Sequence, residues 1–207
     1  MLSQEIVSTP GTEFDRDGIK NKRLEETDIV IDIRILLFEM GKGGTRLGLG
    51  DIDGDSEIEI VVNDNPSHVL NAILKSEEWA YNGGFGIDMT VGDVDGDIIA
   101  EIAYIESWEN AYVFEADTLT AKWHLGDLSD INTVVVADTD GDGVAEVLIG
   151  DGQWGNVTGY RGNDGTKLWE IPNPLWGVFS IGVGDTDNDS SMRFFGEWGN
   201  LVTVLCL

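Results

Sequence analysis

The chain has 207 residues, of which 39 are Asp or Glu and only 12 are Lys or Arg, so its formal net charge at pH 7 is −27. So few cationic residues exclude a nucleic-acid partner, because phosphate binding needs clustered Lys and Arg. No run of 18 apolar residues is present, so no membrane span is predicted. An apolar content of 42% with seven Trp argues against disorder, and the length suits one domain with a substantial core.

In chain order, residues 1–28 are predicted to be a polar tail, and residues 29–38 an apolar, β-branched strand. The start of the chain lacks the apolar stretch of a signal peptide. Cys206 is the single cysteine, so internal disulfides are excluded and cysteine usage does not indicate a compartment.

From about residue 45 onward the chain repeats one unit four times, and each unit contains an acidic loop between two short apolar segments. The loops begin at Asp51, Asp93, Asp138 and Asp185, which are 42, 45 and 47 residues apart. A fixed period of roughly 40–50 residues is typical of the four-stranded blades of a β-propeller. The chain is therefore predicted to be all-β, with one propeller domain over residues 29–207. The predicted blades cover approximately residues 45–82, 87–126, 132–171 and 178–207.

Each acidic loop carries carboxylates on alternate residues, at its first, third and fifth positions, and three of the loops add a Glu at the ninth. Ca²⁺ takes roughly six to eight oxygen ligands at about 2.3–2.6 Å, which this spacing can supply. Glycine at the fourth position allows the backbone to reverse there. The predicted metal ligands are Asp51, Asp53, Asp55 and Glu59; Asp93, Asp95, Asp97 and Glu101; Asp138, Asp140, Asp142 and Glu146; and Asp185, Asp187 and Asp189.

The four loops are not equivalent. In the fourth, Asn188 replaces the glycine and Arg193 replaces the ninth-position glutamate, and a guanidinium cannot ligate a cation. The loop at 138–146 is expected to bind best, because it alone has a glycine, Gly143, after its third aspartate. The sequence thus predicts three complete Ca²⁺ sites and a weak fourth. The alternative is that all four are acidic β-turns without a metal.

Before each loop, apolar residues alternate with small ones, as Leu47 and Leu49 alternate with Gly48 and Gly50. This period of two predicts a strand, and the small face is typical of an innermost strand that is crowded around a propeller axis. Third strands are predicted at Val69–Leu74, Ala111–Ala116, Val157–Arg161 and Leu201–Leu207. Fourth strands are predicted around Trp79, Trp123 and Trp169.

The last repeat has no predicted fourth strand, and residues 29–38 fit the vacancy. Leu37 precedes the first loop by 14 residues, and the three strand Trp residues precede the following loops by 14, 15 and 16. The prediction is a small β-propeller of four four-stranded blades, closed by an N-terminal strand that completes the last blade. The alternative is an open array, which a larger propeller or a second chain would complete.

A second set of aromatic residues lies in turns and connectors. Trp108, Trp154 and Trp198 begin the turns after the second strands, and Trp176 lies in a connector, as Phe85 does. Alternating strands would place these residues on the face opposite the acidic loops. Exposed indoles stack on sugar rings, so they are candidate ligand-binding residues. The alternative is that they pack between blades.

The acidic loops resemble those of FG-GAP (integrin α-chain-like) repeats, propeller blades in which a Gly-Asp-x-Asp-Gly-Asp loop between the first two strands binds Ca²⁺. The resemblance covers residues 45–207. It rests on the pairs Gly50-Asp51, Gly92-Asp93, Gly184-Asp185 and Phe85-Gly86. Such repeats occur in adhesion proteins, in lectin-like modules and in some polysaccharide lyases.

The expected function is a non-catalytic, calcium-stabilised binding module for a protein or glycan ligand. An extracellular or cell-surface location is favoured because millimolar Ca²⁺ fills such sites. The chain is expected to be a monomer or a ring-completing homo-oligomer. Two alternatives remain: an enzyme resembling calcium-dependent polysaccharide lyases, and a structural subunit of a larger propeller assembly. His68 and His124, the two histidines, belong to no recognisable catalytic motif.

Overall fold

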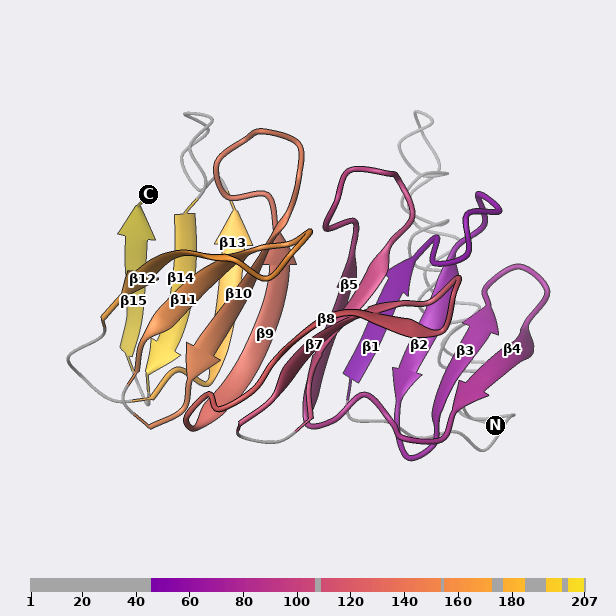
Figure 1. The fold of residues 1–207 in the computed structure, drawn as a ribbon, viewed down its shortest axis with the longest axis horizontal. Helices are drawn as coiled ribbons and strands as arrows, with labels where there is room; N and C mark the ends of the chain where they lie inside the picture. The colour runs from indigo at the N-terminus through magenta and orange to yellow at the C-terminus, as the bar shows by residue number, and fades with distance from the viewer. Residues whose placement is uncertain are drawn as a thin grey trace, which may run out of the picture. The chain divides into compact units, whose positions relative to one another are not determined.

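The computed structural model describes residues 46–106, 109–153, 155–172, 177–184, 193–198 and 201–206, which all belong to one compact unit, Gly44–Leu207. These residues form four antiparallel sheets (Figure 1). Within the same ranges there is no helix, and hence none with the length and apolarity to cross a membrane.

Every sheet is a meander in which consecutive strands pair. The first contains β1 (Arg46–Gly50), β2 (Glu59–Asn63), β3 (Ser67–Asn71) and β4 (Ser76–Tyr81). The second contains β5 (Asp88–Gly92), β6 (Glu101–Ile105), β7 (Ala111–Glu115) and β8 (Thr120–Leu125). The third contains β9 (Ile131–Ala137), β10 (Glu146–Asp151), β11 (Val157–Arg161) and β12 (Lys167–Ile171). The fourth has three described strands, β13 (Ser180–Gly184), β14 (Arg193–Trp198) and β15 (Leu201–Cys206).

The all-β prediction is confirmed for the described residues, and three repeats form four-stranded sheets as expected. The fourth strands predicted around Trp79, Trp123 and Trp169 are β4, β8 and β12. The tail at 1–28 and the closing strand at 29–38 lie outside the described residues. Blade count and ring closure therefore stay predictions.

The third strand of the first repeat was predicted wrongly. It was expected at Val69–Leu74, but it begins two residues earlier and ends at Asn71. Asn71 Oδ1 accepts the backbone N–H groups of Ile73 and Leu74 at 3.0 and 2.8 Å. A side chain that bonds its own backbone in this way offers a turn in place of the strand ladder. The two apolar residues that suggested a longer strand are 65% and 72% exposed.

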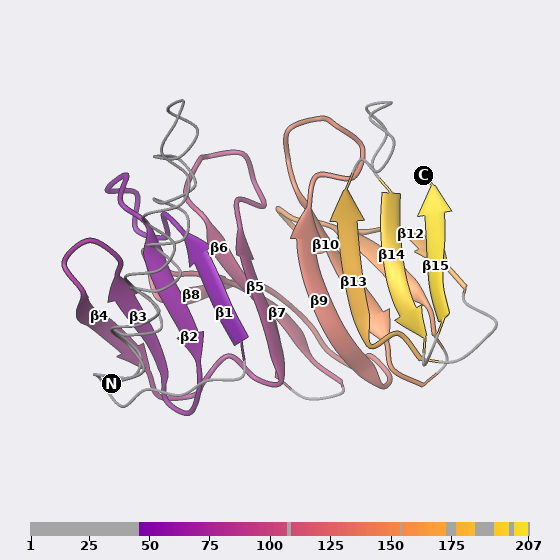
Figure 2. The same cartoon turned by 180° about the vertical axis from the view of Figure 1, so that it is seen from behind.

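The inner strands β1, β5, β9 and β13 are neighbours in that order (Figure 2), so each sheet packs face to face on the next. Val61 of the first sheet shares a buried cluster with Met89 of the second. Val113 of the second sheet shares one with Val147 of the third. The core thus lies between the sheets, as one layer for each pair.

Glycines in the inner strands let neighbouring sheets approach closely. A Cβ added to Gly48 would lie 2.3 Å from Val91 Cγ2, and one added to Gly50 would lie 2.8 Å from Val91 Cγ1. A Cβ added to Gly92 would lie 2.7 Å from Val136 Cγ1. The face of these inner strands that carries small residues is therefore crowded, as the sequence indicated. The side chains that crowd it come from the neighbouring sheet.

Phe85, the other aromatic residue in a connector, is not exposed but packs between the first two sheets. Its side chain is completely buried, and its ring stacks on Tyr81 and meets the edge of Tyr104 at centroid distances of 5.0 and 5.4 Å. The next residue, Gly86, has φ +60°, and a Cβ there would lie 1.8 Å from the carbonyl oxygen of Ile105. The Phe-Gly pair therefore fixes the connector between the first two sheets.

Candidate metal centres

Three groups of carboxylates gather in the loops that leave the inner strands β1, β5 and β9. These loops lie along the same edge of the sheets, the upper edge in Figure 1. In each group, one ligand oxygen from each of three residues lies within 4.8 Å of the others. The groups are Asp51, Asp53 and Glu59; Asp93, Asp95 and Glu101; and Asp138, Asp140 and Glu146. The structure thus brings together the first, third and ninth positions of each predicted site.

The first aspartate of each loop organises the backbone around it. Asp51 Oδ1 accepts the N–H of Gly54 at 2.8 Å, and its Oδ2 accepts the N–H of Ser56 at 2.9 Å. Asp93 makes the corresponding bonds at 2.7 and 2.8 Å, and Asp138 at 2.7 and 2.9 Å. A carboxylate oxygen has two lone pairs, so one remains for a cation. The three loops therefore share one preorganised geometry.

The ninth-position glutamate of each loop is held by one of its two oxygens. Oε2 accepts the N–H of the loop's second residue at 2.9 Å in Glu59, 2.9 Å in Glu101 and 2.8 Å in Glu146. The three residues are 0%, 1% and 5% exposed. In the third loop the hydroxyl of Thr139 also donates to Glu146 Oε2, at 2.5 Å.

The second oxygen of Glu59 and of Glu101, Oε1, is buried and has no hydrogen-bond partner among the described residues. Burial raises the pKa of each of these two carboxyls to about 7, although the backbone N–H bond to each opposes the shift. An ionised carboxylate in such surroundings is costly unless a cation lies close to it. A hard divalent cation within each triad would supply that charge and ligate the orphaned oxygen. The residues present therefore fit Ca²⁺.

The third aspartate of each loop is not part of these groups. Oδ1 of Asp55, Asp97 and Asp142 accepts the N–H two residues further on, at 2.7, 2.8 and 2.8 Å. Their predicted role as ligands stays a prediction.

Several predicted site residues lie outside the described residues, and their roles stay predictions. They are Asp185, Asp187 and Asp189 of the fourth loop, and Trp108, Trp154 and Trp176. Trp198 ends β14, but its side chain is not among those described.

Two positions in each loop have left-handed backbone. The fourth is glycine in all three loops, with φ of +78°, +83° and +79° at Gly54, Gly96 and Gly141. The sixth has φ of +72° at Ser56, +73° at Ile98 and +89° at Gly143. Only glycine adopts this conformation without strain, and a β-branched residue there is an outlier. The loop at 138–146, which the sequence predicts to bind Ca²⁺ best, has glycine at both left-handed positions. Its backbone therefore avoids this strain.

Lys122 adds a positive charge to the second loop. Its Nζ lies 2.6 Å from Asp95 Oδ2 and also bonds Glu115. Burial alone would lower the pKa of Lys122, but its hydrogen bonds to Asp95 and Glu115 raise that pKa above its ordinary value. The sequence analysis missed this residue. The sequence does contain a signal for it. Lys122 directly precedes the Trp of its fourth strand, whereas the same position is Glu78 in the first repeat and Leu168 in the third.

Asp88 is a second residue that the sequence analysis missed. It is only 4% exposed and joins three inner strands. Its Oδ1 accepts a hydrogen bond from Arg46 Nε at 2.5 Å, and its Oδ2 accepts the N–H of Val134 at 3.0 Å. Asp88 therefore fixes the register between neighbouring sheets. A charged residue inside an apolar inner strand was the only signal for it.

No protein-family model matches the chain, and no curated protein matches it. Solved structures do match. BBS1N in complex with ARL6DN matches with a TM-score of 0.60 at 11% identity, over 79% of this chain and 55% of that chain. Saccharomyces cerevisiae Sqt1 matches with a TM-score of 0.56 at 8% identity, over 84% of this chain and 48% of that chain. The V. cholerae biofilm matrix protein Bap1 matches with a TM-score of 0.51 at 21% identity, over 77% of this chain and 26% of that chain.

BBS1N and Sqt1 are β-propeller proteins, so the fold of this chain is that of β-propeller blades. The chain spans about half the length of these two structures. At such low identity the similarity concerns the fold alone.

Proposed function

We propose that the chain is a non-catalytic β-propeller module that is stabilised by Ca²⁺ in the manner of FG-GAP repeats and binds a protein or glycan ligand. The observation that carries the calcium proposal is the orphaned, buried Oε1 of Glu59 and of Glu101, each within an acidic triad. All donors in the triads are carboxylate oxygens, which suit Ca²⁺ better than a metal that prefers nitrogen or sulfur.

The proposed role of the metal is structural. Each triad joins the end of an inner strand to the start of the next strand, so a bound ion would tie the first two strands of a sheet together. Three Ca²⁺ ions would also offset part of the net charge of −27, which otherwise opposes the compact state. The fourth loop would bind more weakly because of Arg193.

The non-catalytic proposal is supported by the state of the basic residues that a polysaccharide lyase would need. His68 lies in β3 and pairs with Glu77 at 2.9 Å. His124 lies in β8, in another sheet, and stacks on Tyr112 with ring centroids 4.5 Å apart. Lys122, which contacts Asp95 of the second triad, is held protonated by Asp95 and Glu115. Neither histidine belongs to one of the three carboxylate triads.

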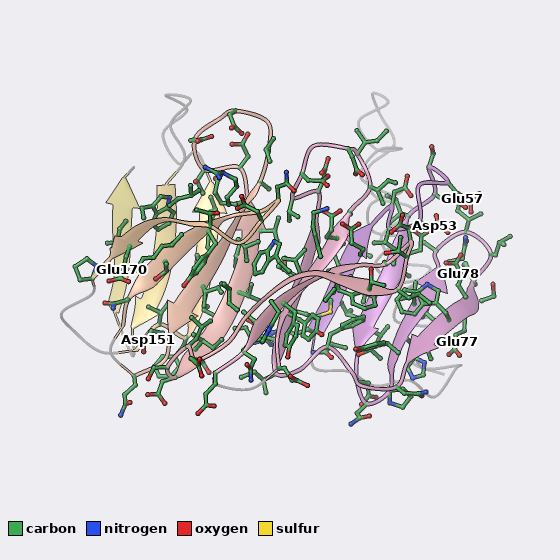
Figure 3. The ribbon with its side chains drawn as sticks, viewed as in Figure 1. Asp53, Glu57, Glu77, Glu78, Asp151 and Glu170 are labelled. Atoms are coloured by element: carbon green, nitrogen blue, oxygen red, sulfur yellow. The ribbon has the colours of Figure 1, made fainter. Side chains whose placement is uncertain are left out.

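The proposed ligand surface is the face opposite the acidic loops. Figure 3 shows Asp53, in the first loop, and Asp151, at the end of β10, at opposite ends of the sheets. A pocket of about 310 Å³ lies beside Asp151, and its rim includes Phe179, which is 53% exposed. The pocket is lined by Asp130, Ile131, Asn132, Gly152, Gln153 and Phe179. An exposed aromatic ring beside amide and carboxylate groups suits a sugar.

A protein ligand is supported by the fold. BBS1N, which matches this chain, was crystallised in complex with ARL6DN. A protein that shares this fold thus forms a complex with another protein. An extracellular or cell-surface location is proposed because millimolar Ca²⁺ is available there.

The test of the calcium proposal is the melting temperature after complete metal removal. Ca²⁺ should raise it, because saturation at roughly one hundred times the dissociation constant adds about 2.7 kcal/mol per independent site. Mg²⁺ at equal concentration should raise it less. A melting temperature that Ca²⁺ leaves unchanged, once removal of metal by EDTA is verified, would contradict the proposal.

The test of the binding proposal is a glycan array combined with an assay for turnover. Binding without the absorbance of an unsaturated product would support a module. Formation of that product from an acidic polysaccharide would support the lyase-like alternative instead.

A further inference from the structure

The four sheets pack by one repeated contact between inner strands. Two apolar residues, two and four positions before the acidic loop, lie against the preceding sheet, and the residues between them lie against the following sheet. At the first junction, Met89 and Val91 cover Gly48 and Gly50, where added Cβ atoms would lie 2.8 Å or less from them. At the second junction, Val136 covers Gly92 in the same way.

The third junction follows the same rule. Ile181, four positions before the fourth loop, is 8% exposed and shares a buried cluster with Leu148 of the third sheet. Val135 and Val183, which are partly buried, pack against that cluster. At each junction, therefore, two apolar residues of one inner strand pack on the preceding inner strand. They contact the residues of that strand that alternate with its own apolar pair.

Each end of the array carries one half of this contact. On β1, Leu47 and Leu49 hold the positions of Met89 and Val91, but they are 51% and 52% exposed, whereas Met89 is 4% exposed. On β13, Gly182 and Gly184 hold the positions of Gly48 and Gly50. Among the described residues, a Cβ added to either of these two glycines would meet nothing within 4 Å.

We propose that these two ends bind each other between two copies of the chain. Leu47 and Leu49 of one protomer pack over Gly182 and Gly184 of its partner, and the partner's leucines pack over the glycines of the first. Such a head-to-tail contact closes when the rotation permits, and two identical contacts around a twofold axis form a ring. The resulting ring holds four sheets from each protomer.

The order of the inner strands supports closure by a second copy. A four-bladed ring within one chain needs β13 beside β1, but the neighbouring pairs among the described inner strands are β1–β5, β5–β9 and β9–β13. The propeller structures that match this chain contain about twice the length that it covers. A ring of that kind is complete with two copies.

The opening at β1 is confined to the inner strand. Ile60, Val62 and Leu70, further out on the same face, are 0–1% exposed. The proposed contact is therefore centred on the strands nearest the ring axis, where the glycine and leucine positions face each other. It depends neither on calcium nor on the ligand proposed above.

The experiment is sedimentation velocity of the full chain over a range of concentrations, with three kinds of variant. The wild type should have twice the 22.6 kDa mass of one chain. Leu47→Asp/Leu49→Asp and, separately, Gly182→Trp should each give monomers, because both junctions of the ring contain the substituted surface. Leu74→Asp and Asn163→Trp, exposed positions away from the two ends, should remain dimers.

Mixing the two monomeric variants makes the test specific. Their heterodimer contains one junction with both substitutions and one wild-type junction, so dimers should return in the mixture. A dimer in which like ends meet, with Leu47 of one copy against Leu47 of the other, would not be rescued in this way. Circular dichroism and melting curves would establish that each variant is folded.

Three results would overturn the proposal. The first is a wild-type monomer at all concentrations, which would leave both ends to other segments of the chain. The second is a dimer that survives both end-face variants. The third is a series of trimers and longer polymers, because an open chain of copies is not a closed ring.

Discussion

Glu59 and Glu101 are the residues at which burial and charge conflict most directly. Each has one oxygen bonded to a backbone N–H and one oxygen with no partner among the described residues. An unpaired buried polar group costs roughly 1–3 kcal/mol, and more when it is charged. Without metal these two side chains therefore weaken the fold, and a bound cation would offset that cost.

Substitution of Glu101 by Gln should change stability in opposite directions with and without calcium. At pH 8, above its pKa of about 7, the Glu101 carboxylate is ionised, so its removal should raise stability in EDTA by about 1 kcal/mol. The increase that Ca²⁺ causes should shrink, because a neutral amide is a poorer ligand. Melting curves in EDTA and in Ca²⁺ measure both effects.

Asp117→Asn is the matched control for this charge change, since Asp117 is exposed in the turn between β7 and β8. It should leave both melting curves nearly unchanged. A Glu101→Gln variant that is less stable in EDTA and keeps the full calcium effect would contradict the assignment.

Ile98→Gly should stabilise the protein, although it removes apolar atoms. Ile98 is 85% exposed and has φ +73°, a conformation that costs a side-chain-bearing residue roughly 1–2 kcal/mol. Glycine removes that strain, while it adds flexibility to the unfolded chain. We expect a net gain of about 0.5–1 kcal/mol in urea unfolding.

The reverse change tests the same reasoning in the third loop. Gly143→Ala introduces a side chain at φ +89°, where no atom of the described residues lies within 4 Å of the added atom. Its expected loss of stability is therefore due to backbone strain alone. Equal stability of Gly143→Ala and the wild type would count against this account of both loops.

At the scale of elements, the period of the acidic loops predicted the order of strands well. The alternation of Leu47 with small residues and the Trp at the centre of each fourth strand both reflect local sequence. Ends of strands were less predictable, because Asn71 ends β3 through a side-chain hydrogen bond that its apolar neighbours do not suggest. The triads followed from the spacing, but the contacts of Lys122 and Asp88 did not, since their partners lie in strands and loops distant in the sequence.

Deletion of the segment before the first repeat tests the predicted closing strand. Among the described strands, β15 pairs only with β14, so its other edge is available for residues 29–38 of the same chain or, in the proposed ring, of the partner copy. Deletion of residues 1–28 should be tolerated, because that segment is polar and lies outside the repeat. Deletion of residues 1–40 should expose the edge of β15 and cause aggregation or strand exchange.

Light scattering and melting temperature of the two deletions measure this difference. The shorter deletion serves as the control for the longer one. If the 1–40 deletion kept the melting temperature and the mass of the full chain, residues 29–38 would not complete the fourth sheet.

At the scale of the whole molecule, the chain combines a net charge of −27 with sheets that pack through small, closely fitted contacts. Three carboxylate groups lie along one edge, and their mutual repulsion opposes the packing that brings them together. Bound cations would turn this electrostatic repulsion between carboxylates into an attraction between carboxylates and metal. Calcium is therefore central to the proposed function, and the proposed ligand binding at the opposite face would depend on the scaffold that the metal stabilises.

The most direct measurement is an anomalous difference map from crystals grown with Ca²⁺. The account predicts one peak in each of the three described loops, about 2.3–2.6 Å from carboxylate oxygens of the first, third and ninth positions. In the first two loops the peak should contact Oε1 of Glu59 and of Glu101. Loops without a peak at saturating Ca²⁺, or peaks that do not contact these glutamates, would contradict the account.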